Sequence, residues 1–195
     1  MKSQNSKVPI FVISGPSGSG KTTLAELLLK SKQLKNKLIK SVSMTTRPKR
    51  EEEKRGRAYF FVSRERFKQL NSRKKILEWT RYLGYYYGTP KSFIDKCLAG
   101  NRSPVLCLDV KGALRIKKIY PENTVTIFVV PPRIQELRLR IEKRSRLSAG
   151  EIRKRLQIAK KEIALRKLYN YRVVNRDLKQ ASKCLRDIVL SELKA

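Results

Sequence analysis

Short apolar runs alternate along the chain with stretches in which apolar positions have helical spacing. Turn residues bound the runs, which predicts buried strands. We expect strands near residues 8–14, 103–109, 124–130 and 171–175, and helices that begin near Gly20, Lys111, Pro132 and Asp177. The apolar face of the last helix comprises Leu178, Ala181, Leu185, Ile188 and Val189. This alternation indicates an α/β fold with a largely parallel sheet flanked by helices.

The segment from about residue 41 to 94 breaks this rhythm. It is rich in Thr, Arg, Tyr and Gly and contains only brief strand-like runs, such as the one at 58–62. We interpret it as a lobe inserted into the parallel core. At 195 residues the chain is long enough for one core with one such lobe and too short for two ordinary independent domains.

The sequence Gly-Pro-Ser-Gly-Ser-Gly-Lys-Thr follows the first predicted strand and leads into the first predicted helix. It fits the phosphate-loop pattern, in which glycines let backbone N–H groups point at a phosphate. Lys21 would reach the β- and γ-phosphates, and the Thr22 hydroxyl would be a ligand of Mg²⁺. The predicted nucleoside triphosphate site comprises Gly15, Pro16, Ser17, Gly18, Ser19, Gly20, Lys21, Thr22 and Thr23. A plain Gly/Ser-rich turn is the alternative, but strand, loop and helix all agree with the motif.

Two clusters in the inserted lobe suggest a second substrate. Arg47 and Arg50 lie three residues apart beside hydroxyl side chains, and such a pair can hold a phosphate dianion by bidentate hydrogen bonds. Farther on, Glu78 precedes a run of tyrosines that ends at Thr89. A carboxylate can accept hydrogen bonds from N1–H and the N2 amino group of guanine, a donor pair that adenine lacks. Taken separately, the tyrosines could be core residues and Glu78 a solvated charge.

The order of these motifs resembles that of the guanylate kinase family, over roughly residues 10–190. The resemblance implies one domain with a phosphate-loop NTPase-type core at about 8–40, 95–132 and 167–195, a GMP-binding lobe at about 41–94 and a helical lid at about 133–166. It implies that the GMP phosphate is held by Arg47, Arg50, Tyr59 and Tyr87. It assigns recognition of the guanine ring to Ser43, Glu78 and Thr89.

The same resemblance extends to residues of the core and the lid. Asp109, at the end of a predicted strand, matches a family aspartate that orients Mg²⁺-bound water or holds an arginine of the GMP site, whereas Cys107 and Lys111 replace the usual aspartate and glutamine. Asn175 matches an adenine contact. The resemblance adds Arg140, Arg144 and Arg155, as lid arginines, to Lys21 in the catalytic set.

Composition narrows the chemistry further. The chain has no histidine, which excludes Ser-His-Asp and Cys-His catalysis. Its three cysteines are widely spaced and form no C-x-x-C pair, so we expect neither a disulfide framework nor a zinc site. No apolar stretch approaches the roughly 20 residues that span a bilayer, and the N-terminus lacks signal-peptide features. We therefore expect a cytoplasmic protein without a membrane partner, as a monomer or homodimer.

The formal net charge is +31, from 47 Lys plus Arg against 16 Asp plus Glu. Such a charge suits a polyanionic partner, although the chain contains no recognisable nucleic-acid module. The charge leaves a nucleic-acid partner open beside an anionic substrate.

These observations favour transfer of the γ-phosphoryl group of ATP to GMP, and to dGMP, with Mg²⁺ as cofactor. Three alternatives remain open: a scaffold domain of the same fold that binds phosphorylated peptides, a kinase with another acceptor such as a sugar phosphate, and an enzyme with an added nucleic-acid-binding role. The intact phosphate loop argues against the first, and the shared purpose of the lobe residues argues against the second.

Overall fold

A computed structural model describes residues 8–56, 59–144 and 148–194 and contains two sheets. The larger sheet has the strand order β2-β7-β1-β8-β9, and every pair of neighbours is parallel. Its strands are β1 (Ile10–Ser14), β2 (Leu38–Lys40), β7 (Ser103–Leu108), β8 (Thr124–Val130) and β9 (Tyr171–Val174). The predicted parallel sheet is thereby confirmed, with the short edge strand β2 in addition.

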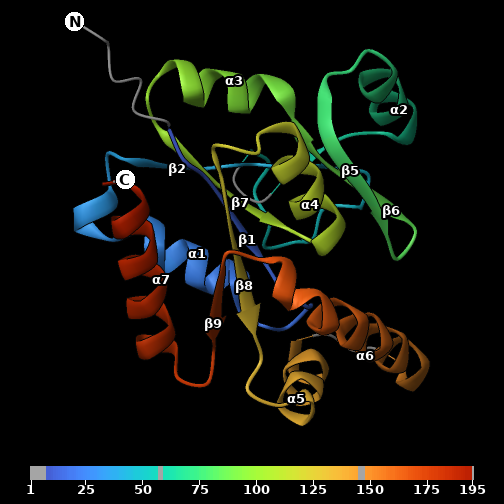
Figure 1. The fold of residues 1–195 in the computed structure, drawn as a ribbon. Helices are drawn as coiled ribbons and strands as arrows, with labels where there is room; N and C mark the ends of the chain where they lie inside the picture. Colours follow the sequence, from blue (N-terminus) through green and yellow to red (C-terminus); the bar gives the residue numbers. More distant parts are fainter. Residues whose placement is uncertain (1–7, 57–58, 145–147, 195) are drawn as a thin grey trace, which may run out of the picture.

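Apolar side chains cover both faces of this sheet. Along β1, Phe11 and Ile13 belong to one buried cluster, whereas Ile10 and Val12 belong to another, because successive side chains of a strand point to opposite faces. The first cluster is covered by α1 (Lys21–Leu29) and α7 (Leu178–Glu192), and the second by α3 (Lys91–Ala99) and α4 (Val110–Ile119). Figure 1 shows these helix pairs on opposite sides of the sheet. Two buried faces explain why the strands are continuously apolar.

Aspartates cap two of the core helices, and one of them shifts a predicted strand end. The prediction placed Asp109 in a strand, but Asp109 caps the N-terminus of α4, because its carboxylate accepts a hydrogen bond from Gly112 N. The helix predicted to begin near Asp177 is confirmed, because Asp177 caps α7 in the same way by accepting from Gln180 N. Leu178 was predicted to lie on the buried face of α7, but it is 43% exposed at the first turn of the helix.

The second sheet lies within the segment predicted to be an inserted lobe. It has the order β4-β3-β6-β5 and combines antiparallel pairs with the short parallel pair β3–β4. Its elements are β3 (Met44–Thr45), β4 (Phe60–Phe61), α2 (Arg64–Ser72), β5 (Ile76–Tyr82) and β6 (Tyr85–Pro90). The hairpin β5–β6 contacts α4 and α3, so the lobe lies against the core.

Helices α5 (Ile134–Arg144) and α6 (Ala149–Ala164) follow β8 and pack against each other through a small apolar cluster of Leu137, Ile141 and Ala159. Two 3-10 turns, η1 (Lys32–Leu34) and η2 (Leu165–Leu168), complete the described elements. Figure 1 shows α5 and α6 beyond the carboxyl end of β8, the end of the sheet at which α/β proteins bind ligands. Within the described part of the chain, every helix falls short of the length and apolarity needed to cross a bilayer.

Candidate functional site

The predicted phosphate loop connects β1 to α1 and has a backbone that only glycine adopts without strain. Gly15 and Gly20 have φ of +146° and +90°. A Cβ atom on Gly15 would lie 2.5 Å from the carbonyl oxygen of Val129 in β8, and a Cβ on Gly20 would overlap Nδ2 of Asn175. The loop is therefore packed tightly against the ends of the neighbouring strands.

Asn175, the residue that follows β9, supports this loop. Its backbone N–H donates to the carbonyl oxygen of Val130, and its side-chain Nδ2 donates to the carbonyl oxygen of Ser19 at 2.8 Å. The carbonyl oxygen of Asn175 accepts a 3.2 Å hydrogen bond from Nη2 of Arg140 in α5. Asn175 thus joins the loop, the sheet and the predicted lid; an adenine contact for it stays a prediction.

We expect Gly20→Ala to lower the free energy of unfolding by about 3 kcal/mol and Gly84→Ala by about 1 kcal/mol, measured by urea denaturation. Both glycines have nearly the same φ, +90° and +87°, so both substitutions strain the backbone. Only at Gly20 does the new methyl group also break the Asn175–Ser19 hydrogen bond, because Gly84 faces open space. Equal losses for the two variants would contradict this role of Asn175.

The end of the phosphate loop and the first turn of α1 are open to solvent, whereas Ser19 is buried. Lys21 is half-buried and its Nζ lies 3.4 Å from the carbonyl oxygen of Pro16, whereas Thr22 and Thr23 are exposed at the first turn of α1. The Ser19 hydroxyl is buried without a hydrogen-bond partner among the described residues. An N–H-rich loop followed by a helix N-terminus favours an anion at this position.

Two carboxylates face the same region from different elements. Burial raises the pKa of Glu162 in α6 to about 7; the Lys21 ammonium opposes this shift, and the Asp109 carboxylate adds to it. Sequence reasoning placed Asp109 here but missed Glu162, which lies in a run of lysines and arginines that is typical of a solvated helix face. The burial of Glu162 became visible only when α6 was placed against the core.

Of the three predicted lid arginines, two have described side chains. Arg140 bonds to Asn175 and lies 3.6 Å from Glu136. Arg155 in α6 has a buried Nε without a hydrogen-bond partner among the described residues. Burial raises the pKa of its neighbour Tyr82 in β5, and Arg155 and Ser17 oppose that shift. Tyr82, which was not predicted, thus brings β5 close to both α6 of the predicted lid and the phosphate loop.

Arg144 ends α5, and its side chain is outside the described part of the structure.

Glu78 and Thr89, predicted from the second cluster, pair with each other in the interior. Glu78 is only 4% exposed, and its Oε1 accepts a 2.6 Å hydrogen bond from the Thr89 hydroxyl. A Cβ on Gly112 in α4 would lie 2.7 Å from Oε2 of Glu78, so the carboxylate reaches the core. Burial raises the pKa of Glu78 to about 7, and the charge of Asp109 adds to this while Thr89 opposes it. A solvated charge is therefore excluded for Glu78.

Because Glu78 holds its proton up to about pH 7, it should make stability depend on pH. The unfolded chain releases this proton near pH 4.5 and the folded chain near pH 7, so the free energy of unfolding falls across that window. Between pH 4 and pH 8 the free energy of unfolding should fall in both proteins, but by about 3 kcal/mol less in Glu78→Gln than in the unchanged protein, because glutamine has no proton to release. Urea denaturation at several pH values measures this difference. Parallel pH curves for the two proteins would contradict the buried proton.

Some of the residues predicted to bind the acceptor phosphate lie in contact with one another. The guanidinium carbon of Arg47 lies 5.6 Å from the centre of the Tyr59 ring, and the rings of Tyr59 and Tyr87 meet edge to face at 5.8 Å. Arg50 is exposed, and the hydrogen bonds that tie it to this segment come from its backbone: its N–H donates to the Glu53 carboxylate, and its carbonyl oxygen accepts from Glu53 N. Ser43 precedes β3, and continuing the Met44–Gly88 register places it opposite Thr89. The structure thus brings together Arg47, Tyr59 and Tyr87, while the Arg50 side chain is not part of the contact.

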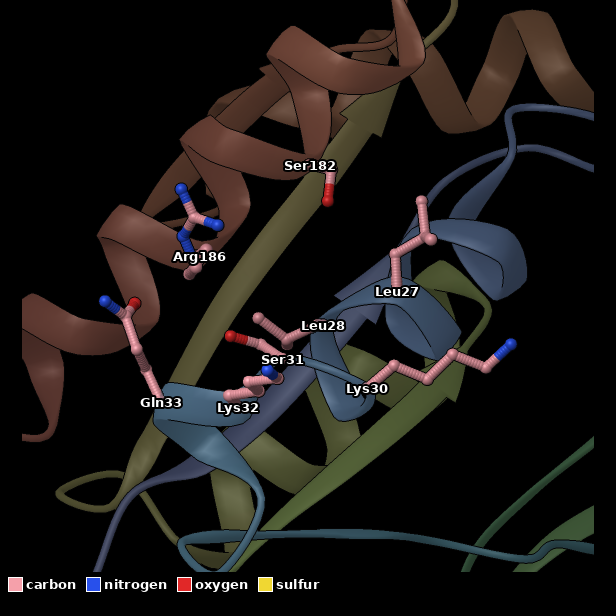
Figure 2. A pocket seen from close by; sticks show the side chains of 8 residues that line it. All are labelled: Leu27, Leu28, Lys30, Ser31, Lys32, Gln33, Ser182 and Arg186. Carbon is pink, nitrogen blue, oxygen red and sulfur yellow. The ribbon is translucent and has the colours of Figure 1, made fainter.

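The pocket drawn in Figure 2 is separate from these residues. It has a volume of about 350 Å³ and lies between the carboxyl end of α1 and α7. Its lining comprises Leu27, Leu28, Lys30, Ser31, Lys32, Gln33, Ser182 and Arg186. A larger hollow of about 690 Å³ lies beside β5, with Glu78, Trp79 and Lys111 in its lining. Only the second hollow includes a residue of the predicted site.

Comparison with known proteins agrees with this arrangement. The family model described as guanylate kinase matches residues 7–192. The guanylate kinase of Caldanaerobacter subterraneus is 44% identical over 184 residues, which cover 94% of this chain and 87% of that protein. The guanylate kinase of Thermotoga maritima is 43% identical over 186 residues, covering 95% and 88% of the two chains.

A solved structure is also similar along nearly the whole chain. The crystal structure of guanylate kinase from Anaplasma phagocytophilum has a TM-score of 0.79 and 33% identity, and the match covers 96% of this chain and 87% of that one. A family model over most of the sequence, relatives above 40% identity and a matching fold all agree. The chain therefore belongs to the guanylate kinase family.

Proposed function

We propose that this protein transfers the γ-phosphoryl group of ATP to GMP, and to dGMP, giving ADP and the guanosine diphosphate. The observation that carries the proposal is the buried Glu78–Thr89 pair, a hydrogen-bonding carboxylate in the interior of a chain that also has an intact phosphate loop. Asp109 lies between the Glu78–Thr89 pair and the phosphate-loop region, because its charge acts on the pKa of both Glu78 and Glu162. The donor and acceptor sites would accordingly meet at the end of β7.

In this proposal the lobe at about 41–94 binds GMP. Glu78, ionised on binding, accepts hydrogen bonds from N1–H and the N2 amino group of guanine. Thr89 and Ser43 provide further hydrogen-bonding groups to the guanine ring. Arg47, Arg50, Tyr59 and Tyr87 hold the phosphate. Such a site would reject adenine strongly, because adenine lacks the two donors that the buried Glu78 carboxylate needs as partners.

The phosphate loop, with Thr23 at its end and Asn175 beside it, binds ATP. Lys21 and the backbone N–H groups neutralise the β- and γ-phosphates, and Arg140, Arg144 and Arg155 close over the transferring group as the lid, at about 133–166, moves in. The attacking GMP oxygen is already anionic, so no strong general base is needed. Closure excludes water and thereby protects ATP from hydrolysis.

Mg²⁺ fits the donors present. Phosphate-bound Mg²⁺ needs few protein ligands, and the exposed Thr22 hydroxyl at the loop would supply one. Cys107 is unsuited to hold it, because burial raises the pKa of the thiol to about 11 and Mg²⁺ prefers oxygen. When bound, Mg²⁺ would neutralise charge on the phosphates.

The test is a coupled assay of ADP release with ATP and Mg²⁺, comparing GMP, dGMP, AMP, CMP and UMP as acceptors. We expect turnover with GMP and dGMP alone. Comparable turnover with AMP would contradict guanine recognition, and no turnover with any nucleotide would favour the scaffold alternative. Retention on nucleic acid at physiological salt would support the added role that the +31 charge leaves open.

A further inference from the structure

Glu53 lies in the segment between β3 and β4, and its carboxylate binds Arg47. Nη2 of Arg47 donates to Oε1 of Glu53 at 2.6 Å and to Oε2 at 2.9 Å. Nη1 of the same guanidinium donates to the carbonyl oxygen of Pro48 at 2.7 Å. These hydrogen bonds fix both terminal nitrogens of Arg47, and none of them uses Nε.

The pair is shielded from solvent on both sides. The side chains of Arg47 and Glu53 are 13% and 14% exposed, far less than most ion pairs at a protein surface. Burial by itself would lower the pKa of Arg47, but the hydrogen bond and charge of Glu53, together with smaller contributions from Tyr87, outweigh it and raise that pKa. Burial likewise opposes the ionised form of Glu53, yet Arg47 and the Arg50 N–H hold its pKa below the usual value. Both groups are therefore charged at neutral pH.

The same carboxylate also shapes the backbone. Oε2 of Glu53 accepts a 2.9 Å hydrogen bond from the backbone N–H of Arg50, three residues upstream. One side chain thus holds the guanidinium of Arg47 and the main chain of Arg50. The guanidinium is held against Tyr59, which in turn contacts Tyr87.

We propose that Glu53 is a positioning residue for the acceptor phosphate: it holds Arg47 against Tyr59 and Tyr87 and fixes the turn that carries Arg50. This role rests on the proposed function, in which these four residues bind the GMP phosphate. A guanidinium that is ordered before the ligand arrives loses less conformational entropy on binding. Glu53 contributes to affinity for the phosphate and makes no contact with the guanine ring.

The test replaces Glu53 with glutamine, which keeps the shape and removes the charge. Glu51→Gln and Glu52→Gln are matched controls, since both carboxylates are exposed, lie in the same segment and carry the same charge. Dissociation constants for GMP and for guanosine, which lacks the phosphate, are measured by calorimetry or competition, together with kcat and the KM for ATP. We expect Glu53→Gln to bind GMP about 10-fold more weakly, with guanosine binding and the KM for ATP unchanged.

The variant Glu53→Asp keeps the charge on a shorter side chain, so its dissociation constant for GMP should lie between those of the unchanged protein and Glu53→Gln. In an Arg47→Ala background, Glu53→Gln should add little further loss, because its partner is gone. Equal weakening of guanosine and GMP would mean a general structural role and overturn the proposal. Unchanged GMP affinity would also overturn it, and tighter binding would show that Glu53 competes with the phosphate.

The unchanged protein separates this proposal from the function on which it rests. If it neither binds GMP nor releases ADP with it, the proposed function fails and the role of Glu53 fails with it. If it does both and Glu53→Gln matches the Glu51 and Glu52 controls, the role of Glu53 alone is overturned.

Discussion

Lys21→Ala should reduce kcat for phosphoryl transfer by about 10³-fold while leaving the thermal unfolding midpoint nearly unchanged. Lys21 is half-buried at the end of the phosphate loop, where its ammonium acts on the Glu162 carboxylate and would reach the transferring phosphate. Alanine keeps the helix, because it is the best helix former, and removes the charge. Steady-state kinetics with ATP and GMP measure the effect.

Lys30→Ala is the matched control for this variant. Lys30 is exposed at the carboxyl end of the same helix and lines the separate pocket of Figure 2. The control removes the same charge from the residue that caps the carboxyl end of α1 and should leave kcat within about two-fold, as expected for a surface substitution. Near-normal activity of Lys21→Ala would refute the assigned donor site.

Glu78→Gln should raise the KM for GMP by about 100-fold and leave the KM for ATP unchanged. Glutamine retains an oxygen that can accept from the Thr89 hydroxyl, but its amide group presents donors to the donor edge of guanine. The variant is expected to be at least as stable as the unchanged protein at neutral pH, because it removes the partly ionised buried carboxylate. Its loss of GMP affinity would therefore not arise from unfolding.

Glu65→Gln is the control in the same lobe, since Glu65 is exposed in the first turn of α2 and distant from the Glu78–Thr89 pair in sequence. Both KM values should be unchanged in this control. Equal losses for GMP and ATP in Glu78→Gln would remove Glu78 from guanine recognition and assign it a general role in holding the lobe against α4.

The proposed donor site departs from the family pattern at Cys107. The side chain packs against the apolar cluster under α1, and burial keeps its thiol protonated. The Lys21 ammonium and the Asp109 carboxylate, which lies just after β7, both act on Glu162 in α6, and position 107 carries no ionised group. In the proposed function, negative charge near the donor phosphates would come from Asp109, just after β7, and from Glu162 in the helix of the predicted lid.

Local patterns were enough to identify the parallel sheet, the phosphate loop and the family. Continuous apolar runs, the glycines of the loop and the adjoining helix are encoded by neighbouring residues, so their signals can be read without a fold. The predicted end of one strand was wrong, because Asp109 serves as a helix cap and lies beyond the strand to which it was assigned. A carboxylate at a strand end allows both interpretations until its hydrogen bond is known.

The sequence by itself determined which chemistry is available: a phosphate loop, arginines with tyrosines, and Glu78 before Thr89. Only the tertiary structure decided which charges are buried and paired. Glu53 resembles its exposed neighbours Glu51 and Glu52, yet it alone binds Arg47. Glu162 lies among lysines and arginines, yet it faces Lys21. Burial and pairing depend on residues distant in sequence, and a charged side chain gives no local sign of which partner the fold will bring to it.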